Sequence, residues 1–419
     1  SLKPMAGSFV VDRKGLFGVD LLGETAEIGV SDSLLPAPGH HYSRATMHAV
    51  PGGKAMLIYR HIENKTSASL VRVLVDPITG ALDTSLPPLV AGANAYNGTP
   101  DVFAHAFGWV ASAPSAGKML FVWEGRDGIG NKKLHQLWGR IYDKDHLPLT
   151  PAALIAEDHC DGDCRPEVHA LPASRWLVVW SGDNGGIRSR RVSGNLVDGQ
   201  LGLPGLAPET LATFGDGATA ATFEGNVLLG WRDGDEGGPL WRMYAYTAGD
   251  DKLKAALSAT PFGAKSLLSP RPAVVALQTP SGGANLLFVG AWAEAKAPGA
   301  LNIRRIGNDG TALGVDLGLG ETQVDRLVAV AGKLGQVALL ERIEAAAQGK
   351  TGIALRLRKT RYAAVGDVGE QLGDVVNIAP ATGAWSVEPS LCYVPEVDAY
   401  AMAWSGGHAS GGIWIQRFR

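Results

Sequence analysis

Short runs of apolar residues, four to seven residues long, recur along the whole chain and are separated by glycine, proline, asparagine and aspartate. Runs of this length between turn-forming residues are typical of β-strands. Apolar residues with helical spacing are almost absent. The one candidate, the alanine-rich stretch 341–348, is expected to form a loop with at most a short turn of helix.

The strand pattern repeats along the chain. The clearest copy, residues 165–199, predicts a short strand, an apolar strand ending at Trp180, a polar loop and a strand through Arg191. The last copy, residues 388–419, shares the Trp-Ser-Gly after the apolar strand and the later Gly-Gly-Ile. In seven copies the apolar strands end near residues 59, 123, 180, 231, 290, 340 and 404, at a mean spacing of about 57 residues.

Four short strands at this period are typical of a β-propeller blade. We therefore predict an all-β protein, a seven-bladed β-propeller with four-stranded blades, in a single domain over residues 1–419. The last copy lacks a fourth strand, and residues 25–31 resemble the outer strand that precedes other copies, so an N-terminal strand should close the last blade. The expected blades are 32–85, 86–155, 156–208, 209–262, 263–320, 321–380, and 381–419 with 25–31.

Two residue types recur at fixed places in the repeat. Tryptophans at the strand ends can be interpreted as a sugar-stacking set, but periodic aromatic residues usually pack between blades. The arginines of the third strand are spread around a ring and cannot meet at one ligand, so inter-blade hydrogen bonds are expected of them. The residues are Trp123, Trp180, Trp231 and Trp404, and Arg72, Arg140, Arg190, Arg242, Arg304, Arg356 and Arg417.

Long polar segments join the second strand of each copy to the third, and others lead into each inner strand. Both kinds lie on one face of a propeller, and variable loops on a rigid scaffold usually carry function. We therefore expect one binding face, with loops that include 61–65, 124–133 and 341–350. Its candidate residues are His40, His41, Arg44, His61, Arg126, Asp127, His159, Asp183, Asn184, Asp233, Asp235, Glu294 and His408.

The acidic segment 157–164 is a candidate metal loop. Asp158, Asp161 and Asp163 could supply oxygen ligands to Ca²⁺, although no complete calcium-loop motif is present. Zinc held by the two cysteines of this segment and His159 would lack a fourth local ligand. No other cofactor is expected.

The chain has three cysteines. Cys160 and Cys164 are close enough to form a local disulfide, which would suit an oxidising compartment. Cys392 lies in an apolar run and is expected to be a buried thiol. His48 and His169 occupy the same position of the inner strand and are expected to be hydrogen-bonded core histidines.

Catalysis is the alternative function of the loop face. The acids Asp183, Asp233, Asp235 and Glu294 could hydrolyse a glycan if two of them lay within about 5–10 Å of each other. The chain has no nucleophile elbow, no zinc-protease motif, no P-loop and no dinucleotide fingerprint.

Composition excludes several partners. The chain has 38 basic and 41 acidic residues, a net charge of −3, so the basic excess of a nucleic-acid-binding protein is absent. No apolar stretch reaches the roughly 18 residues of a membrane span. Apolar residues make up 46% of the chain and charged residues 19%, which excludes a disordered protein. A monomer is expected.

Residues 176–180 with 185–191, and 399–404 with 411–417, carry a resemblance over residues 25–419 to bacterial seven-bladed β-propeller proteins that are secreted or surface-exposed. The loop 181–185 is only faintly similar to a sialidase Asp-box, because the following Thr-Trp is missing. The resemblance implies a periplasmic, cell-surface or extracellular location. The favoured function is a non-catalytic binding or scaffold propeller that engages a glycan or protein partner, with a glycan hydrolase or a structural subunit of a surface assembly as alternatives.

Overall fold

The structure is a computed structural model of the 419-residue chain. It describes residues 3–4, 26–28, 41–64, 67–90, 107–127, 134–158, 164–182, 186–203, 207–233, 238–262, 271–278, 286–293, 299–322, 324–347, 350–363, 368–379, 389–405 and 413–419.

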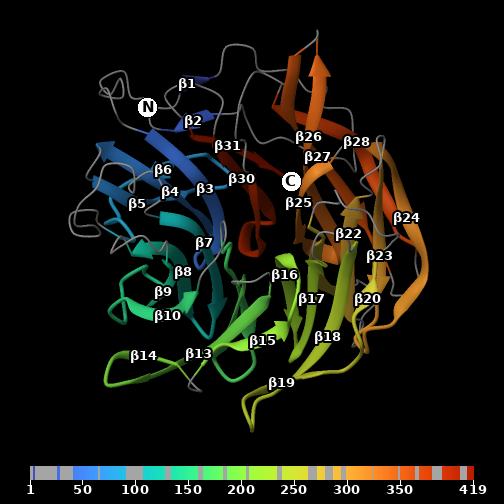
Figure 1. Ribbon diagram of the computed structural model, residues 1–419. Coiled ribbons are helices and arrows are strands. Elements are labelled where there is room, and N and C mark those ends of the chain that lie inside the picture. The colour runs from blue at the N-terminus through green and yellow to red at the C-terminus, as the bar shows by residue number, and fades with distance from the viewer. Residues whose placement is uncertain are drawn as a thin grey trace.

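Seven antiparallel sheets in these residues stand around a common centre (Figure 1). Over the same residues there is no α-helix, and the 3₁₀ turns Lys333–Gly335 and Pro395–Val397 are the only helical elements. The predicted all-β fold of seven four-stranded blades is therefore confirmed. No helix in the described ranges is long and apolar enough to cross a membrane.

Each blade runs from an inner strand to an outer one. The strands of the first six blades, in chain order, are β3 (His41–Val50), β4 (Lys54–Asn64), β5 (Ser67–Val75) and β6 (Leu82–Asp83); β7 (Phe107–Ser115), β8 (Lys118–Asp127), β9 (Leu134–Tyr142) and β10 (Ala153–Asp158); β11 (Glu167–Leu171), β12 (Arg175–Ser181), β13 (Ile187–Val197), β14 (Gln200–Gly202) and β15 (Glu209–Ala212); β16 (Asp216–Phe223), β17 (Asn226–Arg232), β18 (Pro239–Thr247), β19 (Lys252–Ala255) and β20 (Thr260–Pro261); β21 (Ala273–Gln278), β22 (Leu286–Ala293), β23 (Gly299–Ile306) and β24 (Ala312–Thr322); and β25 (Val324–Ala331), β26 (Gln336–Ala347), β27 (Lys350–Arg361) and β28 (Glu370–Ala379).

The seventh blade contains both ends of the chain. Its strands β29 (Ser390–Val394), β30 (Ala399–Ser405) and β31 (Ile413–Phe418) are followed by β2 (Ala26–Ile28), which pairs antiparallel with β31. The predicted closure by an N-terminal strand is therefore confirmed. A further strand that the repeat did not predict, β1 (Lys3–Pro4), pairs with β2.

The core lies between neighbouring blades, where side chains of adjacent sheets form shared apolar clusters. The four recurring tryptophans are buried there, which confirms that they pack between blades and do not form a sugar-stacking set; they are Trp123, Trp180, Trp231 and Trp404. Removing one such side chain would cost about 3–5 kcal/mol.

Five of the seven recurring arginines donate to backbone carbonyls across a blade boundary: Arg72, Arg190, Arg242, Arg304 and Arg417. Arg72 Nη1 donates to His146 O at 3.3 Å, and Arg417 Nη1 donates to Ile78 O at 2.7 Å. The Arg304 guanidinium lies 5.0 Å from the centre of the Trp292 ring. These contacts match the inter-blade role expected of this position.

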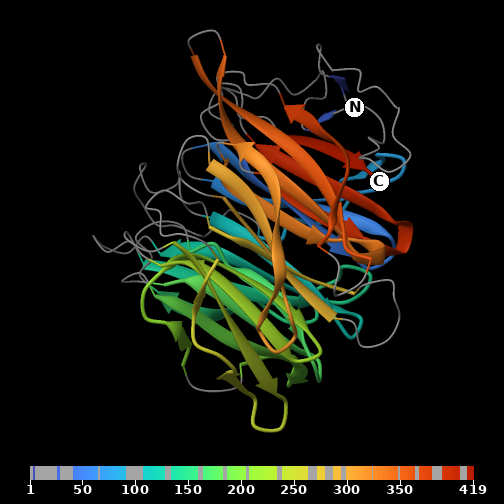
Figure 2. The same cartoon turned by 90° about the vertical axis from the view of Figure 1, so that its right-hand side faces the viewer.

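The prediction that residues 341–350 form a loop with a turn of helix is wrong. β26 and β27 form one continuous hairpin whose pairing extends to Ala347 and Lys350, and it rises above its neighbours (Figures 1 and 2). The partner strand satisfies the backbone hydrogen bonds, which outweighs the helical preference of alanine. Glu341 is therefore a buried sheet residue, close to Arg356 and Arg358, and not a loop residue of the binding face.

Two other loops are shorter than predicted for the same reason. His61 lies within β4, opposite Ser69 of β5, and β8 continues to Asp127. Polar side chains at a blade edge are compatible with strand pairing because only the backbone makes the ladder. The loops predicted from the polar composition of these segments were therefore too long.

Candidate functional site

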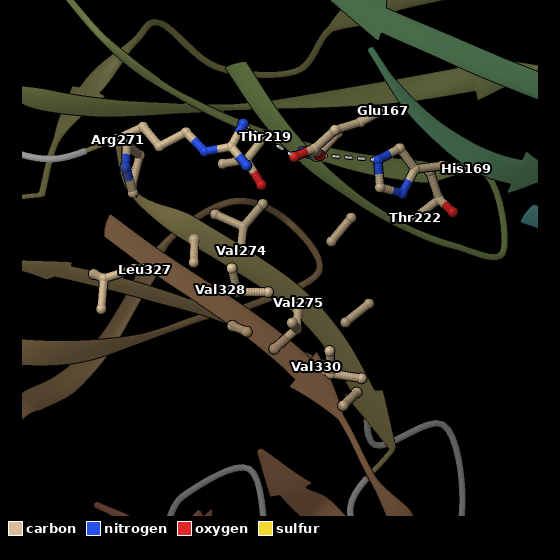
Figure 3. Close-up of a pocket in the computed structure, with 17 residues that line it drawn as sticks. Glu167, His169, Thr219, Thr222, Arg271, Val274, Val275, Leu327, Val328 and Val330 are labelled. Atoms are coloured by element: carbon tan, nitrogen blue, oxygen red, sulfur yellow. Dashed lines mark hydrogen bonds and ion pairs between the residues drawn. The ribbon is translucent and has the colours of Figure 1, made fainter. Parts of the chain in front are cut away.

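A cavity of about 320 Å³ is lined by the inner strands β11, β16, β21 and β25 (Figure 3). One part of its wall is polar and the rest consists of alanine, valine, proline and leucine. The polar side chains are Glu167, His169, Thr219, Thr222 and Arg271. A small cavity with a few convergent polar groups in a mostly apolar wall is the usual form of a ligand site.

Glu167 is the centre of the polar wall. Its Oε2 accepts a hydrogen bond from the backbone N–H of Ala220 at 2.8 Å and lies 3.3 Å from His169 Nε2. Its Oε1 lies 3.6 Å from Arg271 Nη1. Burial alone would raise the pKa of Glu167, but the His169 hydrogen bond and the nearby charges of Arg271 and His169 outweigh it and lower the pKa. The carboxylate is therefore ionised at neutral pH.

Arg271 reaches the cavity from the residues just before β21. Its stem packs against Gly217, where a Cβ would lie only 2.7 Å from Arg271 Cβ and where φ is +58°. Its Nη1 donates to Ala218 O at 3.4 Å. A guanidinium has five N–H donors, so the contacts within the described residues leave several of them for a ligand.

The polar cluster lies at the end of the inner strands that is nearest to the predicted binding face. Glu167 is the first residue of β11, and Arg271 lies two residues before the start of β21. Antiparallel strands place the start of the inner strand beside the end of the second strand. Ser181, the last residue of β12, accordingly lies near the start of the neighbouring inner strand β16, where its Oγ accepts a hydrogen bond from Ala218 N at 3.5 Å.

None of the predicted binding residues that are described lines this cavity. Arg44 has a φ of +55°, and its backbone N–H donates to Ser405 Oγ at 3.1 Å, which joins the first blade to the seventh. His41 and His61 lie in the first blade, Arg126 and Asp127 end β8, and Asp233 follows β17. The remaining candidates lie outside the described residues and stay predictions: His40, His159, Asp183, Asn184, Asp235, Glu294 and His408.

The predicted metal loop is described only at its edges. Asp158 is the last residue of β10, and Asp161 and Asp163 lie outside the described residues. Among the described residues, no group of three or more histidine, cysteine or acidic side chains is placed to hold a metal ion. Calcium at this loop stays a prediction.

Cys164 is buried and disulfide-bonded. Cys160, its predicted partner, lies outside the described residues, so the pairing itself stays a prediction. Cys392 is a free buried thiol, as expected, and burial raises its pKa to about 12.

The two equivalent histidines differ in their surroundings. His48 is buried, its Nε2 lies 2.8 Å from Thr46 Oγ1, and burial lowers its pKa to about 3. This confirms a hydrogen-bonded core histidine at that position. His169 makes the corresponding contact to Glu167 but lines the cavity.

Sequence reasoning missed Glu167 and Arg271. Both left a signal, since Arg-Pro opens an inner strand at 165–166 and at 271–272, and Glu167 and His169 stand two residues apart on one face of a strand. Both residues are charged and stand beside apolar residues at the start of an inner strand. That contrast is the signal that could have identified them.

No protein-family model and no curated protein matches this sequence. Solved structures are similar to it at low identity. The phage phi92 endosialidase is 9% identical, with 95% of this chain and 69% of that chain covered and a TM-score of 0.46. The β-propeller domain of the Trilobed protease from Pyrococcus furiosus is 11% identical, with coverages of 91% and 94% and a TM-score of 0.46.

A third similar structure is the sialidase of Trypanosoma rangeli, at 9% identity and a TM-score of 0.41. The alignment covers 75% of this chain and 55% of that chain, so this chain spans about half of that enzyme. Similarity at this level concerns the propeller fold and not the chemistry of a site.

Proposed function

We propose that the protein is a non-catalytic binding propeller that holds a glycan in the cavity between its inner strands, on the loop side of the ring. The observation that carries the proposal is the cluster of Glu167, His169 and Arg271 on the wall of the 320 Å³ cavity. Ligand pockets usually measure about 300–1,000 Å³, so this cavity suits one small ring and not a large partner surface.

The chemistry of the wall suits a sugar. A sugar offers hydroxyl groups that both donate and accept, together with C–H faces that are apolar. Arg271 supplies donors, the Glu167 carboxylate supplies acceptors, and Thr219 adds a hydroxyl. Val275 and Leu327 belong to the apolar remainder of the wall, on which the C–H face of a ring can pack.

The same wall favours binding over hydrolysis. Most glycosidases use two carboxyl groups, one of them a general acid with a raised pKa. Glu167 is the single carboxylate that lines the described cavity, and its pKa is lowered. Within the described cavity it therefore has no second carboxylate beside it, and its lowered pKa disfavours the protonated form that acid catalysis at neutral pH needs.

The proposed glycan ligand is one that a protein exported from the cytosol would encounter. The disulfide at Cys164 supports a periplasmic, cell-surface or extracellular location, because disulfides persist in oxidising compartments. The proposal therefore places glycan binding outside the cytosol.

A glycan array with the purified protein tests the proposal, followed by titration of the bound glycan against Arg271→Ala. We expect at least a tenfold loss of affinity, because a charged hydrogen bond contributes about 1.5–3 kcal/mol. Arg361→Ala is the matched control, since Arg361 pairs with Glu370 at the exposed end of β27.

Four outcomes would contradict the proposal. Unchanged affinity in Arg271→Ala would place the glycan elsewhere, and an array without binding would remove glycans as ligands. Release of a chromogenic aglycone from glycosides, lost in Asp233→Asn, would favour a hydrolase that uses loop acids. A protein captured from the native envelope, with no glycan bound, would favour a structural subunit.

A further inference from the structure

Phe214 is an exposed aromatic residue beside the candidate site. Its side chain is 69% exposed, and it is the one aromatic residue among the exposed large hydrophobic side chains of the described chain. It lies between β15 and β16, on the lead-in to an inner strand. Ala212 of β15 pairs with Ile187, the first residue of β13, which places Phe214 on the loop-side face.

The backbone on the C-terminal side of Phe214 is held tightly. Gly215 has a φ of +130°, and a Cβ there would lie 2.3 Å from Trp231 Cδ1 and 2.7 Å from Arg232 O. The Asp216 carboxylate accepts from Arg232 Nε at 2.7 Å. These contacts fix the chain beside Phe214 to the end of β17 and hold the residue on the loop-side surface, where its ring is exposed.

The same segment leads directly to the polar cluster. Gly217 packs against the stem of Arg271, and Ala218 O accepts from the Arg271 guanidinium. Two residues further on, Ala220 N donates to Glu167. Phe214 is three residues from Gly217, a reach of about 10 Å at most. Two linked sugar rings can span that distance, whereas one ring cannot.

We propose that Phe214 is the stacking platform for a second pyranose ring, so that the ligand is a glycan of at least two pyranose units whose end occupies the cavity. This rests on the proposed function and assigns the class of glycan. The C–H face of a pyranose covers an aromatic ring and removes apolar surface of both from water. The recurring tryptophans cannot serve in this way because they are buried.

The probes for the test are glucose, galactose and N-acetylglucosamine, with cellobiose, lactose and chitobiose as the matching disaccharides. Dissociation constants are measured by titration calorimetry for the wild-type protein, Phe214→Ala and Phe214→Trp. Leu147→Ala is the control, because Leu147 is 56% exposed in the turn between β9 and β10, at the opposite face. Arg271→Ala reports on the cavity itself.

We expect the wild-type protein to bind one disaccharide more tightly than its monosaccharide. Phe214→Ala should weaken that disaccharide about tenfold, which corresponds to the roughly 1.4 kcal/mol of one aromatic contact. The same variant should leave the monosaccharide unchanged, whereas Arg271→Ala should weaken both sugars. In Phe214→Trp, the new exposed indole should shift its emission on addition of the disaccharide and not of the monosaccharide.

Equal affinity of Phe214→Ala and wild type for the disaccharide would overturn the platform and leave the proposed function standing, provided that Arg271→Ala still weakens binding. Equal loss for both sugars would show that Phe214 acts on the cavity and not on a second ring. If the wild-type protein binds none of the six probes, the assignment to a pyranose disaccharide is wrong.

Discussion

Glu167 connects three blades, and replacing it with glutamine tests that connection. Its carboxylate accepts from Ala220 N on β16 and lies close to His169 on its own strand and to Arg271 ahead of β21. In Glu167→Gln the amide oxygen can still accept from Ala220 N. The negative charge is lost, and the half-buried guanidinium of Arg271 loses its counter-ion.

The expected cost follows from the contacts. Hydrogen bonds to charged groups contribute about 1.5–3 kcal/mol and neutral ones about 0.5–1.5 kcal/mol. The Arg271 side chain is 26% exposed, so solvent screens part of the ion pair. We therefore expect a loss of about 1–2 kcal/mol in the free energy of unfolding at pH 7. A chain of 419 residues has an unfolding entropy near 0.9 kcal/mol/K, so Tm should fall by only about 1–2 °C.

The effect should depend on pH in one direction. The pKa of Glu167 in the folded protein is lowered from its ordinary value of 4.5, so ionised Glu167 stabilises the fold above pH 4.5. This contribution is lost as the pH falls through the folded pKa. The difference between wild type and Glu167→Gln should therefore be full at pH 7 and decrease in acid below pH 4.5.

Urea unfolding followed by tryptophan fluorescence at several pH values measures this difference. Glu370→Gln is the control, since Glu370 forms an exposed pair with Arg361 and its loss should cost almost nothing. A Glu167→Gln variant as stable as wild type at pH 7, or a difference that stays constant into acid, would refute the interpretation.

Two further predictions concern the scaffold. Glu341→Ala should lower the free energy of unfolding by about 3–5 kcal/mol, because it leaves Arg356 and Arg358 without their buried counter-ion; urea unfolding measures the loss, and a change as small as in Glu370→Ala would contradict it. Glu27→Pro should lower the unfolding midpoint, because proline removes a backbone donor from β2, which pairs with β31; hydrogen exchange should show lost protection in β31, and unchanged exchange there would argue against closure by this strand.

The sequence was sufficient for the architecture because the repeat constrains it many times over. Each copy predicts the same strands, and the missing fourth strand of the last copy predicted the pairing of β2 with β31. Local detail was harder to predict. The pairing of Ala347 with Lys350 depends on a partner strand, and the alanines themselves gave no sign of it.

The candidate site was predicted only in its general place, the loop-side face. Glu167 and Arg271 belong to the third and fifth blades, and only the curvature of the ring brings them together. Composition and spacing along the chain carry no information about that curvature. A polar residue on an inner strand therefore looks the same whether it bonds within its blade, like His48 to Thr46, or faces a cavity, like His169.

The pairing of β2 with β31 has a consequence for biosynthesis. Ala26 leaves the ribosome long before Ile415, its partner in the sheet. Until β31 is made, β2 lacks its partner in the seventh blade, and the nascent ring cannot close at that blade. Contacts of such high sequence separation form late and slowly, so the final step of folding must wait until translation has passed residue 415.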